Sequence, residues 1–539
     1  MQLSILQTFL LSMFIAFMAV ETYWWGGAIY IARPVFAGPL IGLIMGDFQT
    51  GLIVGGSVEM VFMGGLAMGA YSPPNSYIGG MVGTALAITS GSIELGIALA
   101  YPIGVLVQFL NYVATNLNVV FVERGEKLIH EGKVKEAEVW HWMCIIVSRM
   151  LLQYFLPTFV AIWLGSTVVQ NFYDSIPAWV TQGMSIAAGI LPAIGMAAII
   201  STLGGRKGWP FFLAGFVLSA YLKMDVMSIA LLAVVIAVVM ATRGENTGFS
   251  FDTSKVTSGV LDNKDFRRVF FRSFTSMGSM NYKGYNNFGY LYSIRPALEK
   301  IYKDDPEGYQ EALDRNCEFF NSHPYFSNLI MGVSLALEEQ KANGADVDGA
   351  AITATKAALM GPLAGIGDSV FQGTFLTIFK AIGAGMLLQS AESGVATGVV
   401  GMFVYLIPQI LLSWGSRWGF LKYAYKYGTE LVIKLRQSNL FDKFVEGANV
   451  VGMMVIAAMT SSFVNISIKY VVNLTSEGTD LAKEIPIQGI FDAILPKFLP
   501  LMTVILFYKI MQKNQKSGIY WCLIGSFVVG FIGAITGIL

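Results

Sequence analysis

Glu59 is the residue whose surroundings point most directly to ligand binding. It is the charged residue of the glycine-rich run GLIVGGSVEMVFMGG, Gly51 to Gly65. A carboxylate accepts hydrogen bonds from two hydroxyl groups at once, and bonds to a charged acceptor are the stronger kind. We therefore expect Glu59 to hold a ligand rich in hydroxyl groups. The alternative is a carboxylate that caps a helix or bridges two helices.

Two aspartates and a glutamine accompany other glycine-rich segments. Asp47 ends the segment GPLIGLIMGD and Asp368 ends GPLAGIGD, so each is expected to cap the following helix or to contact the same ligand. Gln372, one turn beyond Asp368, offers a donor and an acceptor to a hydroxyl group. The shared Gly-Pro-Leu and Gly-Asp pairs suggest a repeat between the two halves, while chance or a common kind of helix break is an equal explanation.

The stretch GGLAMGAYSPPNSYIGG, Gly64 to Gly80, is expected to interrupt a membrane helix. Pro73 and Pro74 remove backbone donors, and the glycines loosen the chain. Irregular backbone at membrane depth is tolerated inside protein or beside a wet cavity, where transporters bind their substrates. Asn75 follows the prolines, so its amide either reaches such a cavity or bonds its own backbone as a turn residue.

The histidines and cysteines form no catalytic or metal-binding pattern. The chain has three of each: His130, His141 and His323, and Cys144, Cys317 and Cys522. None has the neighbours of a nucleophilic or metal site, so we expect no cofactor, no metal and no phosphorylated residue. His323 is expected to be structural or to lie on a docking surface.

These residues belong to a chain with the composition of a membrane protein. Of its 539 residues 55% are hydrophobic and 13% are charged, against about 25% charged in ordinary soluble domains. A compact core could not hide so much apolar surface from water, whereas lipid can. Up to Val120 the charged residues are Glu21, Arg33, Asp47, Glu59 and Glu94. Charges near the bilayer centre are costly and therefore point to function, although Arg33 is expected to extend to a membrane interface.

Apolar stretches of about 17 to 25 residues are the candidate spanning elements, although several are too short or too rich in glycine and proline to be plain spanning helices. In the first half they cover about residues 3–20, 28–46, 50–70, 78–90, 93–120, 143–168, 180–202 and 210–242. The last of these is expected to break near Lys223 and Asp225. In the second half they cover about residues 350–366, 369–390, 394–414, 446–472, 487–511 and 518–538.

Two polar stretches separate the apolar blocks. Val122 to His141 is expected to be a charged helical hairpin or loop, and a Gly/Ser/Thr-rich linker begins at Arg243. We expect a membrane domain at 1–245, a linker at 246–262 and a second domain at 263–539. In that second domain, residues 263–345 form a helical region on the cytoplasmic side and residues 346–539 lie in the membrane. The expected fold class is an all-α polytopic membrane protein with two related halves, broken or re-entrant helices and short cytoplasmic helical segments.

The distribution of charge gives the expected orientation. Basic residues gather at 243–272, 422–443 and 509–516, and the positive-inside rule places them on the cytoplasmic face. The acidic stretch Asn473 to Glu484 would then face outward. A formal net charge of zero argues against a nucleic-acid partner.

Long blocks of the sequence resemble a known transport family. RPVFAGPLIGLIMGDFQTGLIVGGSVEMVFMG, Arg33 to Gly64, resembles enzyme IIC of the mannose/fructose/sorbose phosphotransferase family. FRRVFFRSF, NYKGYNNFGY, FFNSHPYFSNLIMGVSLALEE and GPLAGIGDSVFQG resemble enzyme IID of the same family. The resemblance covers nearly the whole chain outside the linker. In most relatives IIC and IID are separate chains, whereas here they share one polypeptide.

The resemblance implies a sugar permease of the bacterial cytoplasmic membrane, embedded in lipid and forming homotrimers of the IIC–IID unit. Its partners would be cytoplasmic enzyme IIB, which phosphorylates the delivered sugar, and IIA through IIB. It also implies a sugar-contacting glutamate at Glu59, while Ala67 stands where many relatives carry an asparagine. The substrate would be a hexose or an amino sugar. The alternatives are an ion-coupled sugar symporter, or an additional role as a bacteriocin receptor.

Overall fold

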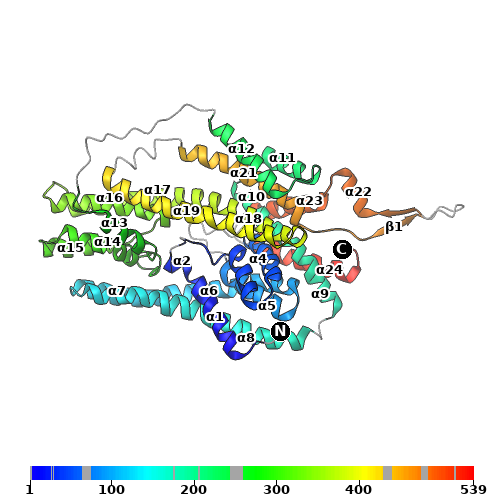
Figure 1. The fold of residues 1–539 in the computed structure, drawn as a ribbon, viewed down its shortest axis with the longest axis horizontal. Coiled ribbons are helices and arrows are strands. Elements are labelled where there is room, and N and C mark those ends of the chain that lie inside the picture. Colours follow the sequence, from blue (N-terminus) through cyan, green and yellow to red (C-terminus); the bar gives the residue numbers. More distant parts are fainter. Residues whose placement is uncertain are drawn as a thin grey trace.

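The computed structural model describes residues 3–25, 27, 29–63, 74–173, 177–203, 207–242, 259–428, 440–474, 483–514 and 518–539. The described chain is almost entirely helical (Figure 1), which confirms the expected fold class. The first half consists of α1 (Ile5–Ala19), α2 (Glu21–Trp24), α3 (Pro34–Met45), α4 (Phe48–Phe62), α5 (Ser76–Ser90), α6 (Ile93–His130), α7 (Val134–Met143), the π-helical segment η1 (Cys144–Phe155), α8 (Leu156–Tyr173), α9 (Ala178–Ile190), α10 (Pro192–Leu203), α11 (Trp209–Ala220) and α12 (Val226–Thr242).

The second half has a helical region followed by long apolar helices. Its elements are α13 (Asn263–Ser273), α14 (Asn287–Ile301), α15 (Pro306–Asn316), α16 (Pro324–Ala342), α17 (Gly349–Gly367), the π-helical segment η3 (Asp368–Leu376), α18 (Thr377–Ser393), α19 (Val395–Tyr427), α21 (Leu440–Phe463), β1 (Val471–Leu474), β2 (Lys483–Pro486), α22 (Ile487–Ile494), α23 (Phe498–Lys513) and α24 (Gly518–Thr536). β1 and β2 pair in antiparallel register, with Val472 opposite Ile485.

Five helices of the described chain are long and apolar enough to cross a membrane. They are Ile5–Trp24, Ile93–His130, Val134–Gly165, Gly349–Ser393 and Val395–Tyr427. The bent pair of α22 and α23, with 75° between its helices, would make a sixth span. The bend replaces the single span expected at about 487–511, because Lys497 adopts a left-handed conformation (φ 61°) between the two helices.

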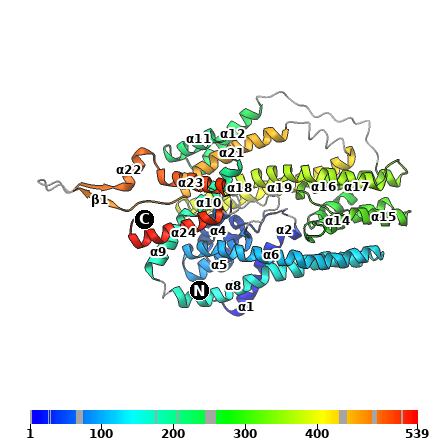
Figure 2. The ribbon, with the colours of Figure 1, turned by 180° about the vertical axis from the view of Figure 1, so that it is seen from behind.

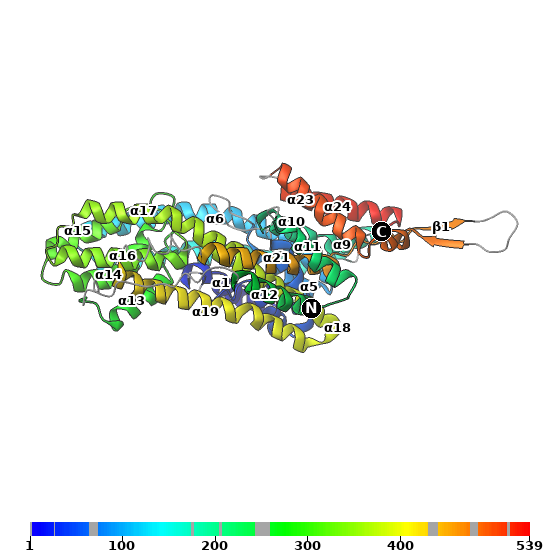
Figure 3. The ribbon, with the colours of Figure 1, turned by 90° about the horizontal axis from the view of Figure 1, so that it is seen from above.

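The longest helices extend well beyond a bilayer. Gly349–Ser393 has 45 residues, which at 1.5 Å per residue is about 68 Å, against about 30 Å for the hydrocarbon core. Helices α13 to α16 lie at one end of the molecule and the β1–β2 hairpin at the other (Figures 2 and 3). The charged helical region and the hairpin are therefore separated by the apolar helices.

Several expected interruptions of the apolar helices are confirmed. The helical hairpin between α6 and α7 turns at Gly132, which has a left-handed φ of 73°. The chain between α11 and α12 also breaks at Lys223 as expected, again with positive φ. The predicted break at Gly64 to Gly80 lies largely outside the described residues, and so does most of the linker at 246–262.

Two other expectations about helix ends are wrong. Asp368 does not follow a break: α17 continues into η3 and α18, because a π-helical segment absorbs the irregularity without ending the helix. Asp47, by contrast, follows a left-handed Gly46 and starts a new helix. The two glycine-rich segments therefore have different local structures. The span expected at 446–472 ends at Phe463, and the chain continues toward β1.

Small residues bring α3, α4 and α18 into close contact. A Cβ on Gly38 of α3 would lie 2.6 Å from Cα of Gly55, so α3 and α4 pack backbone to backbone. A Cβ on the neighbouring Gly56 would lie 3.1 Å from the carbonyl oxygen of Ala384 in α18. The glycine-rich sequence around Glu59 thus holds this residue between helices of both halves.

Candidate functional site

Arg33 and Glu59 form an ion pair between α3 and α4. Both side chains are buried, and Arg33 Nε lies 3.1 Å from Glu59 Oε1 and 3.3 Å from Oε2, with a second guanidinium nitrogen also on Oε1. The third nitrogen donates to Ser76 Oγ at 2.9 Å. The prediction that Arg33 extends to a membrane interface is therefore wrong, because a buried carboxylate partner holds it inside.

The remaining hydrogen-bonding capacity of Glu59 is small. Besides its bonds from Arg33, Glu59 Oε2 accepts the backbone N–H of Val35 at 3.3 Å, in the first turn of α3. A carboxylate offers about four lone-pair directions, and three N–H groups of Arg33 and Val35 point at this one, the Nε–H being shared between both oxygens. This is the interhelix carboxylate that the sequence left as an alternative. A ligand hydroxyl could bond to Glu59 only if one of these donors moved.

Helices of the second half complete the surroundings of the pair. Lys380 of α18 is 1% exposed and interacts electrostatically with both Arg33 and Glu59. No hydrogen bond or ion pair of Lys380 is found among the described residues. Tyr405 of α19 is also buried and in the electrostatic range of the pair. Arg33, Glu59 and Lys380 are here called the Glu59 cluster: three buried ionisable side chains drawn from both halves.

Tyr30 connects the Glu59 cluster to a second group of buried polar residues, which contains Glu21, Tyr325 and His323. Its φ of 58° is unusual for a residue with a side chain and costs about 1–3 kcal/mol. Its N–H donates to Glu21 at 2.9 Å, and its carbonyl oxygen accepts from the Tyr405 hydroxyl at 2.9 Å. Its hydroxyl accepts from Gln372 Nε2 at 3.1 Å and from Tyr325 at 3.2 Å. Three of these four partners come from the second half, so Tyr30 joins the halves.

His323 is part of this second group and is structural, as expected. It is the N-cap of α16, and its Nδ1 accepts the backbone N–H of Tyr325 at 3.3 Å. Its ring stacks on Phe371 with 5.2 Å between centroids, and 2% of the residue is exposed. Burial, with the nearby Arg417, lowers the pKa of His323 to about 3, so the ring is neutral. Such burial is incompatible with the alternative of a docking surface.

Two buried atoms of this region have unused hydrogen-bonding capacity. Glu21 Oε2 and His323 Nε2 are buried without a hydrogen-bond partner in the described part of the chain. Glu21 contacts Tyr30 directly, whereas the His323 ring contacts Tyr325. Buried polar atoms are usually satisfied, so each exception marks a place where a ligand or water can bind.

The other predicted site residues lie in different settings. Asp47 is half-buried and caps α4, its Oδ1 accepting the N–H of Thr50 at 3.0 Å. Twelve residues separate it from Glu59, which is about 18 Å along the helix. Asn75 caps α5 by accepting the N–H of Ile78 at 3.0 Å and lies beside Ser76. Gln372 reaches Tyr30.

Asp368 has a neighbour outside this group. It lies one turn before Gln372, and its electrostatic neighbour is Tyr285 in the loop before α14. The structure thus groups Glu59 with Arg33, places Asn75 and Gln372 at the edge of that group, and leaves Asp47 apart.

Sequence reasoning missed three residues of this region: Tyr30, Lys380 and Arg417. Lys380 and Arg417 are buried charges within the apolar helices α18 and α19. The rule that singled out Glu59, that a charge at membrane depth points to function, would have found both in the second half. No sequence signal marked Tyr30, because its importance lies in its backbone conformation and its partners.

Comparisons with known proteins assign the two halves separately. The family profile described as PTS system mannose/fructose/sorbose family IID component matches residues 260–539, and that described as PTS system sorbose-specific IIC component matches residues 5–239.

Individual relatives agree with these matches. The mannose-specific EIID component of the PTS of Escherichia coli K12 is 33% identical over 287 residues, covering 53% of this chain and 98% of that protein. The fructose permease IID component of Bacillus subtilis 168 is 34% identical, covering 52% and 98%. The mannose-specific EIIC component of E. coli K12 is 31% identical over 208 residues, covering 38% and 77%.

Proposed function

We propose that the Glu59 cluster binds the transported sugar. The premise is that the chain belongs to the mannose/fructose/sorbose family of the phosphotransferase system and carries a IIC and a IID component on one polypeptide. The chain is a multi-pass protein of the bacterial inner membrane and a sugar-translocating subunit. Subunits of this kind work with cytoplasmic IIA and IIB proteins and a sugar substrate.

The observation that carries the proposal is the burial of three ionisable side chains among apolar helices. Arg33 and Glu59 come from the first half and Lys380 from the second. Such residues are expensive at membrane depth and are retained at substrate or ion pathways. A site shared by two halves can open to either side as the halves move against each other.

The chemistry of the cluster suits a neutral polyol. The amine of Lys380 and the guanidinium of Arg33 donate to sugar oxygens, while Glu59 accepts from sugar hydroxyls once Arg33 turns from it to the ligand. Gln372 extends the site through Tyr30. For Asp47, Asn75 and Asp368 we propose that they position the helices around the sugar.

The coupling to phosphorylation follows from charge. IIB phosphorylates the sugar at the cytoplasmic opening, and the product does not return because a sugar phosphate is charged. We propose a hexose or an amino sugar as substrate and a homotrimer as the working assembly. The linker at 246–262 would keep the IIC-like and IID-like domains at equal stoichiometry.

The test replaces an acid by its amide at two positions. Glu59→Gln is expected to lower phosphorylation-dependent uptake of a labelled sugar panel at least tenfold, because a hydrogen bond to a charged group contributes about 1.5–3 kcal/mol. Asp47→Asn is the matched control and should transport nearly normally, since asparagine also caps helices. Normal uptake by Glu59→Gln would refute the sugar-ligand role.

A second arm of the same assay tests the coupling. Uptake should stop when IIB is removed and should persist with a protonophore. Uptake that persists without IIB and stops with the protonophore would instead indicate an ion-coupled symporter.

A further inference from the structure

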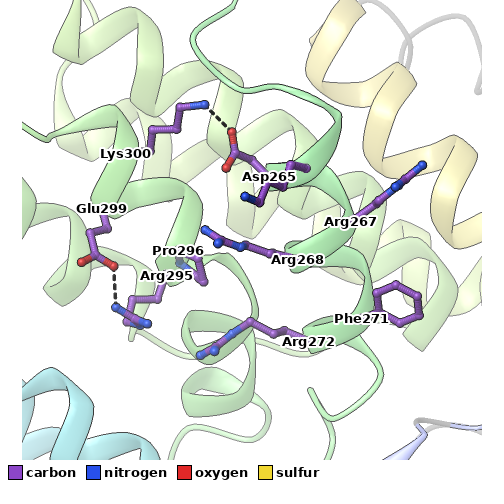
Figure 4. A pocket seen from close by; sticks show the side chains of 10 residues that line it. Asp265, Arg267, Arg268, Phe271, Arg272, Arg295, Pro296, Glu299 and Lys300 are labelled. Carbon is purple, nitrogen blue, oxygen red and sulfur yellow. Dashed lines mark hydrogen bonds and ion pairs between the residues drawn. The ribbon is translucent and has the colours of Figure 1, made fainter.

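A groove of about 830 Å³ between α13 and α14 is strongly basic. Two carboxylates line it, Asp265 and Glu299. Against them stand six cationic side chains, those of Lys264, Arg267, Arg268, Arg272, Arg295 and Lys300. Lys264, Arg268 and Arg272 follow one another at four-residue intervals, so they share one face of α13. Figure 4 shows Arg268 pointing across the groove toward Arg295 and Pro296.

Part of this positive charge has no partner among the residues that the structure describes. Lys300 pairs with Asp265 at 2.5 Å, and Arg295 pairs with Glu299 at 2.8 Å. Arg272 and Arg295 share the carboxylate of Glu138 from α7. Lys264, Arg267 and Arg268 are exposed and form no ion pair with any described residue. The groove is therefore suited to an anion from outside the chain.

The helix Val134–Gly165 gives the depth of the groove. Its large exposed apolar residues recur from Ile146 to Leu164, and Val139 is a further one closer to the groove. The stretch from Ile146 to Leu164 is about 27 Å at 1.5 Å per residue, which is close to the thickness of the hydrocarbon core. Glu138, which holds Arg272 and Arg295, lies eight residues before Ile146. That places the groove within about 12 Å of the hydrocarbon edge.

Helix α19 gives a similar depth independently. Its large exposed apolar residues run from Val395 to Leu411, and Trp414 and Trp418 follow at the level where tryptophan favours the membrane interface. Phe271 of α13 lies 6.2 Å from Trp414 between ring centroids, and Phe270 lies 5.5 Å from Trp418. Arg268 is one turn before these rings on α13, so the groove opens about 5 Å outside the interfacial aromatic residues.

We propose that the groove between α13 and α14 binds the phosphate of an anionic phospholipid headgroup. Its depth matches the headgroup layer, which occupies several Å outside the hydrocarbon core. Guanidinium groups bind phosphate oxygens in a bidentate manner, and Arg268 is the unpaired guanidinium that points into the groove. Phe271, half of whose surface is exposed, faces the acyl-chain side beside Trp414.

A lipid here would have a structural consequence. α13 directly follows the linker and packs on α19, α14 and, through Glu138, on the first half. An anionic lipid would relieve the repulsion among the cations of the groove and hold α13 at the membrane surface. The selectivity is for charge, so phosphatidylglycerol should be preferred over zwitterionic phosphatidylcholine.

The experiment is native mass spectrometry of the full chain in non-ionic detergent with equal amounts of the two lipids. Each cation near an anionic headgroup contributes about fivefold in affinity. Arg268→Gln should therefore lower the preference for phosphatidylglycerol about fivefold, and Lys264→Gln/Arg268→Gln about 25-fold. Lys303→Gln, an exposed cation just past α14 and outside the groove, is the matched control and should leave it unchanged.

Three results would overturn the proposal. The first is equal binding of both lipids by the unaltered chain, or an unchanged preference in the double variant. The second is loss of phosphatidylglycerol in excess inorganic phosphate, which would make the ligand a free phosphate. The third is a double variant that keeps its lipid preference but binds purified IIB more weakly, which would make the groove a protein-docking surface.

Discussion

The Arg33–Glu59 pair allows a double-mutant cycle in which stability and transport should separate. Glu59→Gln keeps the size of the side chain and one acceptor oxygen, so no cavity forms. It leaves Arg33 buried without its carboxylate partner. Removing one partner of a buried ion pair costs about 3–5 kcal/mol, so we expect a loss of stability in that range.

The double variant Arg33→Gln/Glu59→Gln should recover most of that stability. It replaces the ion pair by two amides that can hydrogen-bond to each other. One of them can also accept the N–H of Val35, which donates to Glu59 in the unaltered chain. The two substitutions remove one positive and one negative charge, so the net charge of the Glu59 cluster is unchanged. Replacing both members of a buried ion pair is often close to neutral, so the double variant should regain most of the about 3–5 kcal/mol lost in Glu59→Gln, and the two substitutions should be strongly non-additive.

Transport should not recover in the double variant. The proposed role of the cluster needs a charged acceptor and a guanidinium donor for the sugar, and the two amides supply neither charge. The assays are thermal unfolding of the purified chain in detergent and labelled-sugar uptake at matched expression. A double variant no more stable than Glu59→Gln would refute the electrostatic reasoning. A double variant that transports like the unaltered chain would show that the pair is structural.

Two further predictions concern Tyr30 and His323. Tyr30→Phe should destabilise the chain by about 1–3 kcal/mol, because the partly buried amide of Gln372 and the buried hydroxyl of Tyr325 lose their shared acceptor. The loss should be non-additive with Tyr325→Phe in thermal unfolding, and strictly additive losses would contradict the contact between the two hydroxyls. Burial lowers the pKa of His323 from its usual 6.5 to about 3, so its contribution to stability is complete above pH 6.5 and is lost as the pH falls toward 3, by about 1.4 kcal/mol per pH unit. His323→Asn, which can still cap α16, should therefore flatten the pH dependence of unfolding in that window, and an unchanged profile would show that His323 takes up a proton in the folded chain.

The sequence was sufficient for the membrane fold because lipid imposes a local requirement. A spanning helix must be apolar over its own length, so α1, α6 and α19 can be recognised from contiguous residues. The break before α12 and the hairpin at Gly132 were also local, since turn residues mark both. The continuous helix through Asp368 was not predictable, because a π-helical segment depends on neighbouring helices more than on its own glycines.

In the candidate site, too, some features follow from the local sequence and others from the packing of distant residues. A carboxylate in an apolar, glycine-rich run identified Glu59 without any structure, since a buried charge needs a reason wherever the helix packs. The ion pair with Arg33, the approach of Lys380 from the other half and the strained backbone of Tyr30 came only from the tertiary structure. They depend on distances between residues far apart in the chain. The sequence alone thus determined that the chain lies in the membrane, where its longest apolar helices are, and that Glu59 has a special role. Packing between the two halves decided what Glu59 contacts.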